Sequence, residues 1–229
     1  MTASVDADRL GTRLAAWRGV GRSVIALVVA AAFLLPASTA LAKPDAARAQ
    51  SFVADGIGKA FEILRSRELT EDEQVKRLHD LLRSSFDIKS IGLFSLGPYG
   101  RSITPPQRKA YLSALEEFAV NAYVRRLVTY APTFANGAGN LLKVTGAFEA
   151  GRDDVIVTSE IERKSDKPIP VQWRVRERSN RLYVIDVIIL GVSQALTYKD
   201  VFTSFLQRNN NDIDRLINAL RSQSDLLVK

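Results

Sequence analysis

The chain has 229 residues, with 46% hydrophobic and 25% charged side chains, a formal net charge of +7, one histidine and no cysteine. The lack of cysteine excludes disulfides and thiolate metal sites, and a lone histidine does not support a histidine-based zinc site or a serine triad. Basic residues are scattered among acidic ones without an aromatic-interleaved stripe, so the charge does not indicate nucleic-acid binding.

Residues 1–42 have the pattern of an export signal. Four arginines within the first 22 residues precede an apolar run over residues 24–35, and small residues follow up to Ala42. The apolar run is shorter than the roughly 20 residues that a membrane-spanning helix needs. We therefore predict cleavage after Ala42 and export of residues 43–229. An uncleaved anchor is the alternative, because the basic segment is unusually long.

The exported part would keep 187 residues and a net charge of +5, because residues 1–42 carry four arginines against two aspartates. A chain of that length can bury one substantial core without disulfides, so we predict a single domain over residues 43–229. The mild positive excess is compatible with an anionic lipid or an acidic partner.

Apolar residues at three- and four-residue spacing predict helices in the first half of this domain, beginning with one over residues 44–65. Thr70 and Glu73 form the sequence pattern of a capping box, which predicts the start of a second helix. A short apolar segment over residues 88–96 predicts one or two helical turns folded over a pocket mouth. The longest predicted helix covers residues 105–130.

The pattern changes to strands after residue 140. Val171, Trp173 and Val175 alternate with polar residues, which is the period of a strand with one dry face. Short turns, among them Ser179-Asn180, separate four predicted strands, over residues 141–149, 154–163, 169–178 and 182–190. Two helices follow, over residues 198–208 and 212–222. The sequence therefore predicts an α+β fold with helices packed on one face of a four-stranded antiparallel curved sheet.

Two polar residues are candidates for chemistry. The first is His79, the one histidine, which we expect on the solvated side of its helix and without a chemical function. Asp186 is the one charge in an apolar strand, and a carboxylate there costs several kcal/mol unless it is hydrogen-bonded or paired. It is either a buried anchor that accepts bonds from a turn or an arginine, or a catalytic base in a cone-shaped pocket. The anchor is favoured because no second acid or base is evident.

Two blocks of sequence carry a resemblance to a known family. The residues concerned are Phe86-Asp87, Ser95-Leu96-Gly97, Thr104-Pro105-Pro106-Gln107, Ile185-Asp186-Val187, Gly191-Val192-Ser193, Tyr198-Lys199 and Phe202. In order and spacing they resemble the MlaC family, periplasmic phospholipid-binding proteins of Gram-negative bacteria that are also called toluene-tolerance proteins. Residues 96–99, Leu-Gly-Pro-Tyr, resemble the hopanoid-associated HpnM branch. In the Gly-Val-Ser turn we expect Gly191 to have a positive φ, so that the chain leaves the sheet sharply.

The resemblance implies a carrier with no reaction, cofactor or metal. It implies an apolar cavity between sheet and helices for the acyl chains of a phospholipid or hopanoid-like lipid, which the protein shuttles between outer and inner membranes. The implied partners are an inner-membrane ABC lipid transporter and an outer-membrane lipoprotein complex. The alternatives are an enzyme on a similar curved-sheet scaffold, with Asp186 as base, and a periplasmic adaptor or chaperone whose apolar faces are ordinary core.

On this hypothesis the lipid-contacting residues are apolar side chains of the sheet and of the opposing helices. They are Phe118, Tyr123, Leu127, Tyr130, Val144, Phe148, Val157, Ile161, Val171, Trp173, Val175, Phe202 and Leu206.

Overall fold

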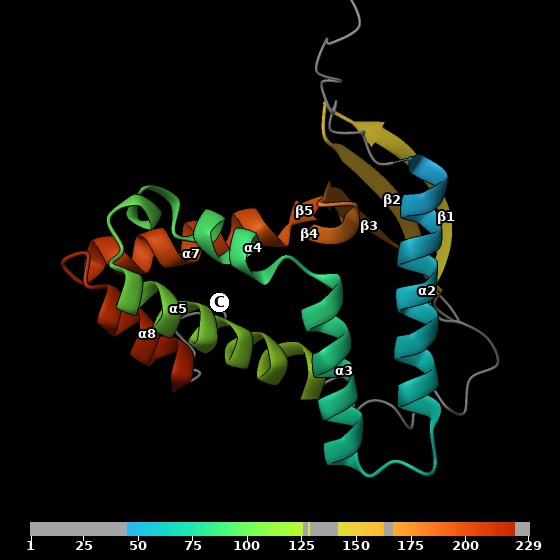
Figure 1. Cartoon of the computed structure of the whole chain (residues 1–229), viewed down its shortest axis with the longest axis horizontal. Coiled ribbons are helices and arrows are strands. Elements are labelled where there is room, and N and C mark those ends of the chain that lie inside the picture. Colours follow the sequence, from blue (N-terminus) through green and yellow to red (C-terminus); the bar gives the residue numbers. More distant parts are fainter. Residues whose placement is uncertain (1–44, 126–127, 129–141, 163–166, 223–229) are drawn as a thin grey trace, which may run out of the picture. The chain divides into compact units, whose positions relative to one another are not determined.

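A computed structural model describes residues 45–125, 128, 142–162 and 167–222 (Figure 1). Its helices are α2 (Ala46–Arg65), α3 (Glu71–Ser85), α4 (Ile88–Ser95), α5 (Pro105–Ala119), α7 (Gln194–Arg208) and α8 (Ile213–Arg221), with a 3-10 turn η2 (Gly97–Arg101) and a π-helical turn η3 (Val120–Val124). Its strands are β1 (Leu142–Ala150), β2 (Asp154–Ile161), β3 (Ile169–Arg178), β4 (Arg181–Ile189) and β5 (Val192–Ser193). The predicted signal, residues 1–42, lies outside the described residues.

The strands form one antiparallel sheet in the order β1-β2-β3-β4-β5, so the predicted α+β fold is confirmed. The sheet has five strands instead of the predicted four, because the chain turns at residues 190–191 and pairs a two-residue strand with β4. None of the helices within the described ranges combines the length and hydropathy of a membrane span.

Helix starts follow from capping chemistry. The Thr70 side chain accepts a bond from the amide of Glu73, and Glu73 accepts bonds from the amide and hydroxyl of Thr70, so the predicted capping box is confirmed. These bonds, the backbone one first, lower the pKa of the Glu73 carboxyl. Thr104 and Gln107 form a second capping box at α5, which ends at Ala119 and continues as the π-helical turn η3. Arg125 and Val128 are again α-helical, so the helix predicted over residues 105–130 is confirmed as far as the structure describes it, with a π turn within it.

Helix α2 lies against β1 and β2 and closes one face of the sheet (Figure 1). Val155 pairs with Val175 and Val157 with Trp173, which places all four on the covered face. We call the resulting cluster the sheet–α2 core; its buried members are Ala49, Val53, Ile57, Val155, Val157, Val175 and Leu182. The predicted alternation in β3 is confirmed, since Val171 and Val175 are buried and the intervening polar residues are only partly so.

The remaining helices build a second core beside the sheet. Helices α4, α5, α7 and α8 pack together (Figure 1), and we call their shared interior the helix-bundle core. Its largest buried side chains include Tyr111, Phe202 and Leu206. The Tyr111 hydroxyl donates to the carbonyl of Gly92 at 3.0 Å, and burial raises the pKa of this phenol. A third, smaller cluster joins α3 to the end of α2.

Two turns use backbone conformations that most side chains avoid. Ser179 and Asn180, which join β3 to β4, have φ of 49° and 61°. Leu190 and Gly191, which join β4 to β5, have φ of 52° and 81°, so the expected positive φ of Gly191 is confirmed. Positive φ at both central residues is typical of a type I′ hairpin turn, for which asparagine and glycine are favoured. Leu190 is therefore an unusual residue in its turn.

Candidate functional site

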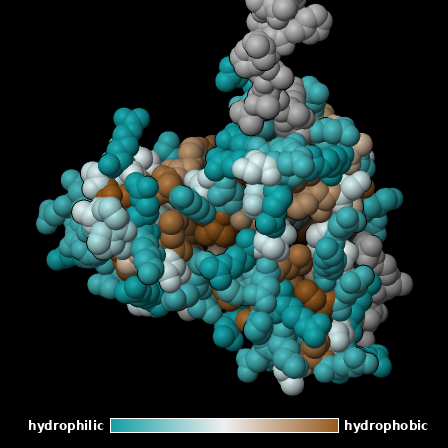
Figure 2. Space-filling model, in the orientation of Figure 1, coloured by the Kyte–Doolittle hydropathy of each residue, from teal (hydrophilic) through white to brown (hydrophobic). Residues whose placement is uncertain are grey.

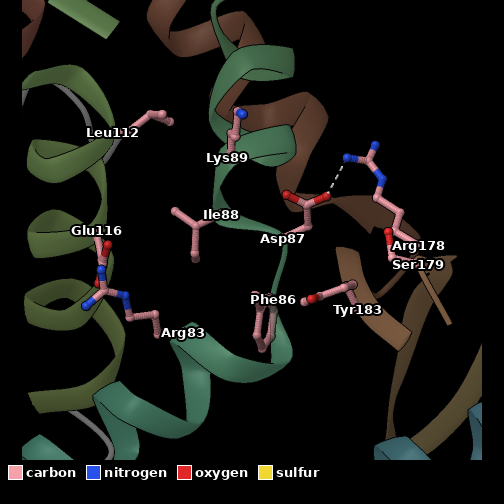
Figure 3. A pocket seen from close by; sticks show the side chains of 10 residues that line it. All are labelled: Arg83, Phe86, Asp87, Ile88, Lys89, Leu112, Glu116, Arg178, Ser179 and Tyr183. Atoms are coloured by element: carbon pink, nitrogen blue, oxygen red, sulfur yellow. Dashed lines mark ion pairs between the residues drawn. The ribbon is translucent and has the colours of Figure 1, made fainter. Parts of the chain in front are cut away.

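A groove of about 460 Å³ lies where α3, α4 and α5 meet the β3–β4 hairpin (Figure 3). We call it the α4 groove. It is lined by Arg83, Phe86, Asp87, Ile88, Lys89, Leu112, Glu116, Arg178, Ser179 and Tyr183. Its volume is in the range of roughly 300–1,000 Å³ that is usual for small-molecule sites. On the face drawn in Figure 2, hydrophobic surface lies over α4 and α5 and is bordered by hydrophilic side chains.

The chain between α3 and α4 positions the apolar part of this groove. Phe86 forms an isolated parallel bridge with Val184, and the Asp87 amide donates to the Val184 carbonyl at 3.0 Å. The Asp87 carboxylate then accepts from the Ser90 amide at 2.9 Å and caps α4. Because this segment is held beside β4, Ile88 points towards α5, whereas Asp87 points the opposite way (Figure 3).

Charged residues surround the apolar ones. Arg178 Nη1 lies 2.9 Å from Asp87 Oδ2 and also donates to the Ser90 hydroxyl. On the α3 side, Arg83 Nε lies 3.4 Å from Glu116 Oε1. The same Glu116 oxygen is 2.8 Å from His79 Nε2, so His79 has a partner on α5 and is not simply solvated as predicted. The described residues that line the groove therefore include three cations, two carboxylates and four apolar side chains.

A second groove, of about 590 Å³, lies between α3 and the α5–η3 segment and shares Arg83 and Glu116 with the α4 groove. Of the eleven described residues that line it, only Val75 and Val120 are apolar. Polar walls make this second groove a poor place to bury hydrocarbon, because the polar groups would lose their water without gaining partners. The α4 groove is the better candidate for an apolar ligand.

The residues predicted to contact lipid lie elsewhere. Val157 and Val175 are buried in the sheet–α2 core, and Val144 and Trp173 pack against it. Phe118, Phe202 and Leu206 belong to the helix-bundle core. The structure thus places the sheet residues and the helix residues in separate cores. Val171 is buried and Ile161 is half-buried on the same sheet face, whereas Leu127 and Tyr130 lie outside the described residues.

The prediction that Phe148 shares a sheet face with Val144 is wrong. The β1–β2 register shifts between Val144 and Gly146, and Phe148 then pairs with Ile156. This extra residue turns the following side chains over, because strand side chains alternate with period two. Phe148 is 51% exposed on the other face. Tyr123 is also exposed, and its hydroxyl is hydrogen-bonded to that of Tyr198.

Asp186 acts as an anchor for the start of α7. Its carboxylate accepts a bond of 2.6 Å from the Ser193 hydroxyl and one of 3.0 Å from the Ala195 amide. Both donors belong to the segment that leads from β5 into α7, so the hydrogen bonds that Asp186 was expected to accept from a turn are confirmed. Within the described part of the chain, no group of three or more His, Asp or Glu residues is arranged to hold a metal ion.

The sequence did not single out Arg83, Ile88, Lys89 or Leu112 as site residues. The usable signal was the short apolar segment over residues 88–96, predicted to lie over a pocket mouth, and α4 does line the α4 groove. The charged lining residues gave no signal, because surface arginine and lysine are common on any helix.

Comparisons with known proteins agree with this fold. A family model described as MlaC protein matches residues 55–222. The solved structure of a phospholipid-binding protein from Ralstonia solanacearum, in complex with a phospholipid, aligns with a TM-score of 0.62 at 19% sequence identity. The alignment covers 79% of this chain and 99% of the Ralstonia chain. At that identity the likeness is one of fold.

Proposed function

Because the chain belongs to the MlaC protein family, we propose that it is a periplasmic lipid carrier, exported by a signal peptide that is removed after Ala42. It holds the acyl chains of a phospholipid, or of a hopanoid-like lipid, and shuttles the lipid between outer and inner membranes. Its partners are an outer-membrane lipoprotein complex and an inner-membrane ABC lipid transporter. The structural relative from Ralstonia, which was solved with a phospholipid, supports a lipid as the ligand.

The physical task of such a carrier is to replace bilayer hydrocarbon with protein hydrocarbon. At ~0.8 kcal/mol per methylene, two chains of about 15 methylenes each would cost roughly 20 kcal/mol to expose to water. A protein that carries lipid through an aqueous compartment must cover most of that surface.

The observation that carries the proposal is the lining of the α4 groove. It combines the apolar side chains of Phe86, Ile88, Leu112 and Tyr183 with cationic side chains. An apolar floor with positive charge beside it matches a lipid, whose tails are apolar and whose phosphate is anionic. The second groove has no comparable floor.

From this groove we propose that the tails extend to the apolar residues of the sheet and bundle that the sequence singled out. Val157, Val175, Phe202 and Leu206 are fully buried by α2 or by neighbouring helices. Tails can reach these residues only if the two cores part, so lipid binding should be coupled to a movement of helices relative to the sheet.

The test is to purify the protein from the periplasm without detergent and to analyse an organic extract by mass spectrometry. We expect phospholipid or hopanoid-like lipid in a fixed molar ratio to protein. An extract without lipid, from protein that also fails to take up lipid from vesicles, would contradict the carrier function and favour an adaptor. N-terminal sequencing of the same sample should begin at Lys43.

A further inference from the structure

Lys89 differs from the other cations of the α4 groove in having no partner among the described residues. It lies in the first turn of α4, lines the groove, is exposed, and makes no hydrogen bond or ion pair with that part of the chain. Arg178, by contrast, is held by Asp87 and Ser90. The Lys89 ammonium therefore keeps its charge and its three donors available to a ligand.

Arg83, across the groove, is held loosely. Its side chain is 68% exposed, and its Nε lies 3.4 Å from a Glu116 oxygen that also lies 2.8 Å from His79 Nε2. An exposed ion pair of this kind contributes little, about 0–1 kcal/mol, so the guanidinium can leave Glu116 for a stronger acceptor at small cost. The carboxylate would still be hydrogen-bonded to His79.

Taken together, the charges of the groove favour an anion. Among the described lining residues, the three cations Arg83, Lys89 and Arg178 exceed the two carboxylates Asp87 and Glu116 by one, and Lys89 is the cation that no described carboxylate pairs. The apolar floor lies beside these groups. A phosphate bound by the cations would therefore be covalently continuous with tails that lie on the floor.

We propose that Lys89, assisted by Arg83, binds the phosphate oxygens of a lipid headgroup at the mouth of the α4 groove and thereby selects phospholipids over neutral lipids. Charge-assisted bonds from ammonium and guanidinium groups to phosphate are among the stronger hydrogen bonds that proteins form. The inference rests on the proposed carrier function and adds the chemistry that discriminates between lipids.

The experiment compares two lipids with identical tails, dioleoylphosphatidylglycerol and dioleoylglycerol, because only the first has a phosphate. Delipidated protein is incubated with vesicles that contain both lipids in equal amounts, and the loaded lipids are extracted and counted by mass spectrometry. Wild type should load phosphatidylglycerol in preference. Lys89→Gln should lower that ratio about threefold, and Lys89→Glu should lower it further, with dioleoylglycerol loading unchanged.

Lys59→Glu on α2 is the matched control, because Lys59 is an exposed lysine that lines neither groove. It should leave the ratio unchanged, and Arg83→Gln should lower it. An equal effect of Lys59→Glu and Lys89→Glu would mean that overall charge selects the lipid, which overturns the inference. An unchanged ratio in Lys89→Glu overturns it as well.

Further outcomes separate headgroup selection from a free-phosphate site and from a failure of the carrier function. Calorimetric titration with inorganic phosphate tests the headgroup assignment. If free phosphate binds saturably and Lys89→Glu abolishes this binding but leaves the lipid ratio unchanged, the groove is a site for free phosphate. That result would overturn the inference. If wild type loads neither lipid, the carrier function itself fails. If wild type loads both lipids equally, the carrier function stands and headgroup selection fails.

Discussion

The carboxylate of Asp186, in the middle of β4, accepts a hydrogen bond of 2.6 Å from the hydroxyl of Ser193, the N-cap residue of α7. Its other oxygen accepts from the Ala195 amide in the first turn of that helix. A negative charge at a helix N-terminus is stabilised by the free amides and by the helix dipole. The pair therefore ties the last long strand to the helix that enters the bundle core.

Asp186→Ala should lower the free energy of unfolding by about 1–3 kcal/mol, because both donors lose their acceptor. Asp186→Asn should cost less, since an amide oxygen can still accept the Ala195 bond. Chemical denaturation checks the order, with Asp200→Asn on the exposed side of α7 as the control. A wild-type midpoint for Asp186→Ala would show that the anchor does not stabilise the fold.

The β4–β5 turn should respond in opposite directions to two substitutions. Leu190 has φ of 52°, a conformation that costs an L-residue with a bulky side chain about 1–2 kcal/mol, and asparagine tolerates it. Leu190→Asn should therefore stabilise the protein by about 0.5–1 kcal/mol. Gly191→Val, at φ of 81°, should destabilise it by at least about 1 kcal/mol. If the denaturation midpoints of both variants shift in the same direction from that of wild type, the backbone strain assigned to this turn is contradicted.

Two glycines in helices provide a second pair with opposite signs. A Cβ on Gly92 would lie 2.8 Å from methyl carbons of Leu112 and Leu115, whereas a Cβ on Gly58 would meet nothing within 4 Å. Overpacking between α4 and α5 costs about 1–3 kcal/mol in Gly92→Ala and is offset by about 1 kcal/mol of helix propensity, so this variant should be destabilised by up to about 2 kcal/mol. Gly58→Ala should stabilise it by about 0.5–1 kcal/mol through helix propensity. Thermal unfolding of both variants tests the close packing of α4 on α5.

A carboxylate introduced in the α4 groove should displace lipid. Ile88 lines the groove in the first turn of α4, where an acidic residue is compatible with the helix N-terminus. Ile88→Asp should reduce co-purified lipid at least about tenfold, because desolvating an unpaired carboxylate beside the tails costs several kcal/mol. Leu196→Asp is the matched control, since Leu196 is 50% exposed and lines neither groove. Equal lipid in the two variants would place the tails elsewhere.

The capping box of α3 predicts a pH dependence. The pKa of Glu73 is lowered first by the bond from the Thr70 amide and then by the bond from its hydroxyl. The folded pKa lies below the unfolded one, so the contribution of Glu73 to stability is present at neutral pH. It is lost as the pH falls below about 4.5 and through the folded pKa.

The free energy of unfolding of wild type should therefore exceed that of Glu73→Gln at neutral pH, and the difference should shrink in acid. Denaturation between pH 7 and acid measures it. Glu71→Gln, in the same helical turn, should show a weaker dependence; a difference that stays constant with pH would mean that the carboxylate charge is not what stabilises the helix start.

Several features could be predicted because they depend on neighbours in the sequence. The Thr70–Glu73 capping box, the alternation around Val175 and the Ser179-Asn180 turn each depend on interactions between residues a few positions apart, and all three are confirmed. Hydrophobic periodicity likewise predicted the order of helices and strands, and with it the α+β class.

Other features depend on which helices and strands pack against one another, and hydrophobic periodicity does not predict these contacts. The single extra residue between Val144 and Gly146 moves the side chain of Phe148 to the other face of the sheet. The sequence of β1 gives no sign of this, because Val144 and Phe148 lie an even number of positions apart, as residues on one face of a regular strand do. Val175 and Phe202 both belong to apolar faces in the sequence pattern, yet Val175 is buried in the sheet–α2 core and Phe202 in the helix-bundle core.

The α4 groove combines residues that lie about a hundred positions apart, such as Arg83 and Tyr183. The sequence by itself determined the elements, the dry face of the sheet and the resemblance to a family of lipid-binding proteins. The tertiary structure decided which apolar surfaces are packed and which stay open, because packing depends on the shapes of side chains that only folding brings together.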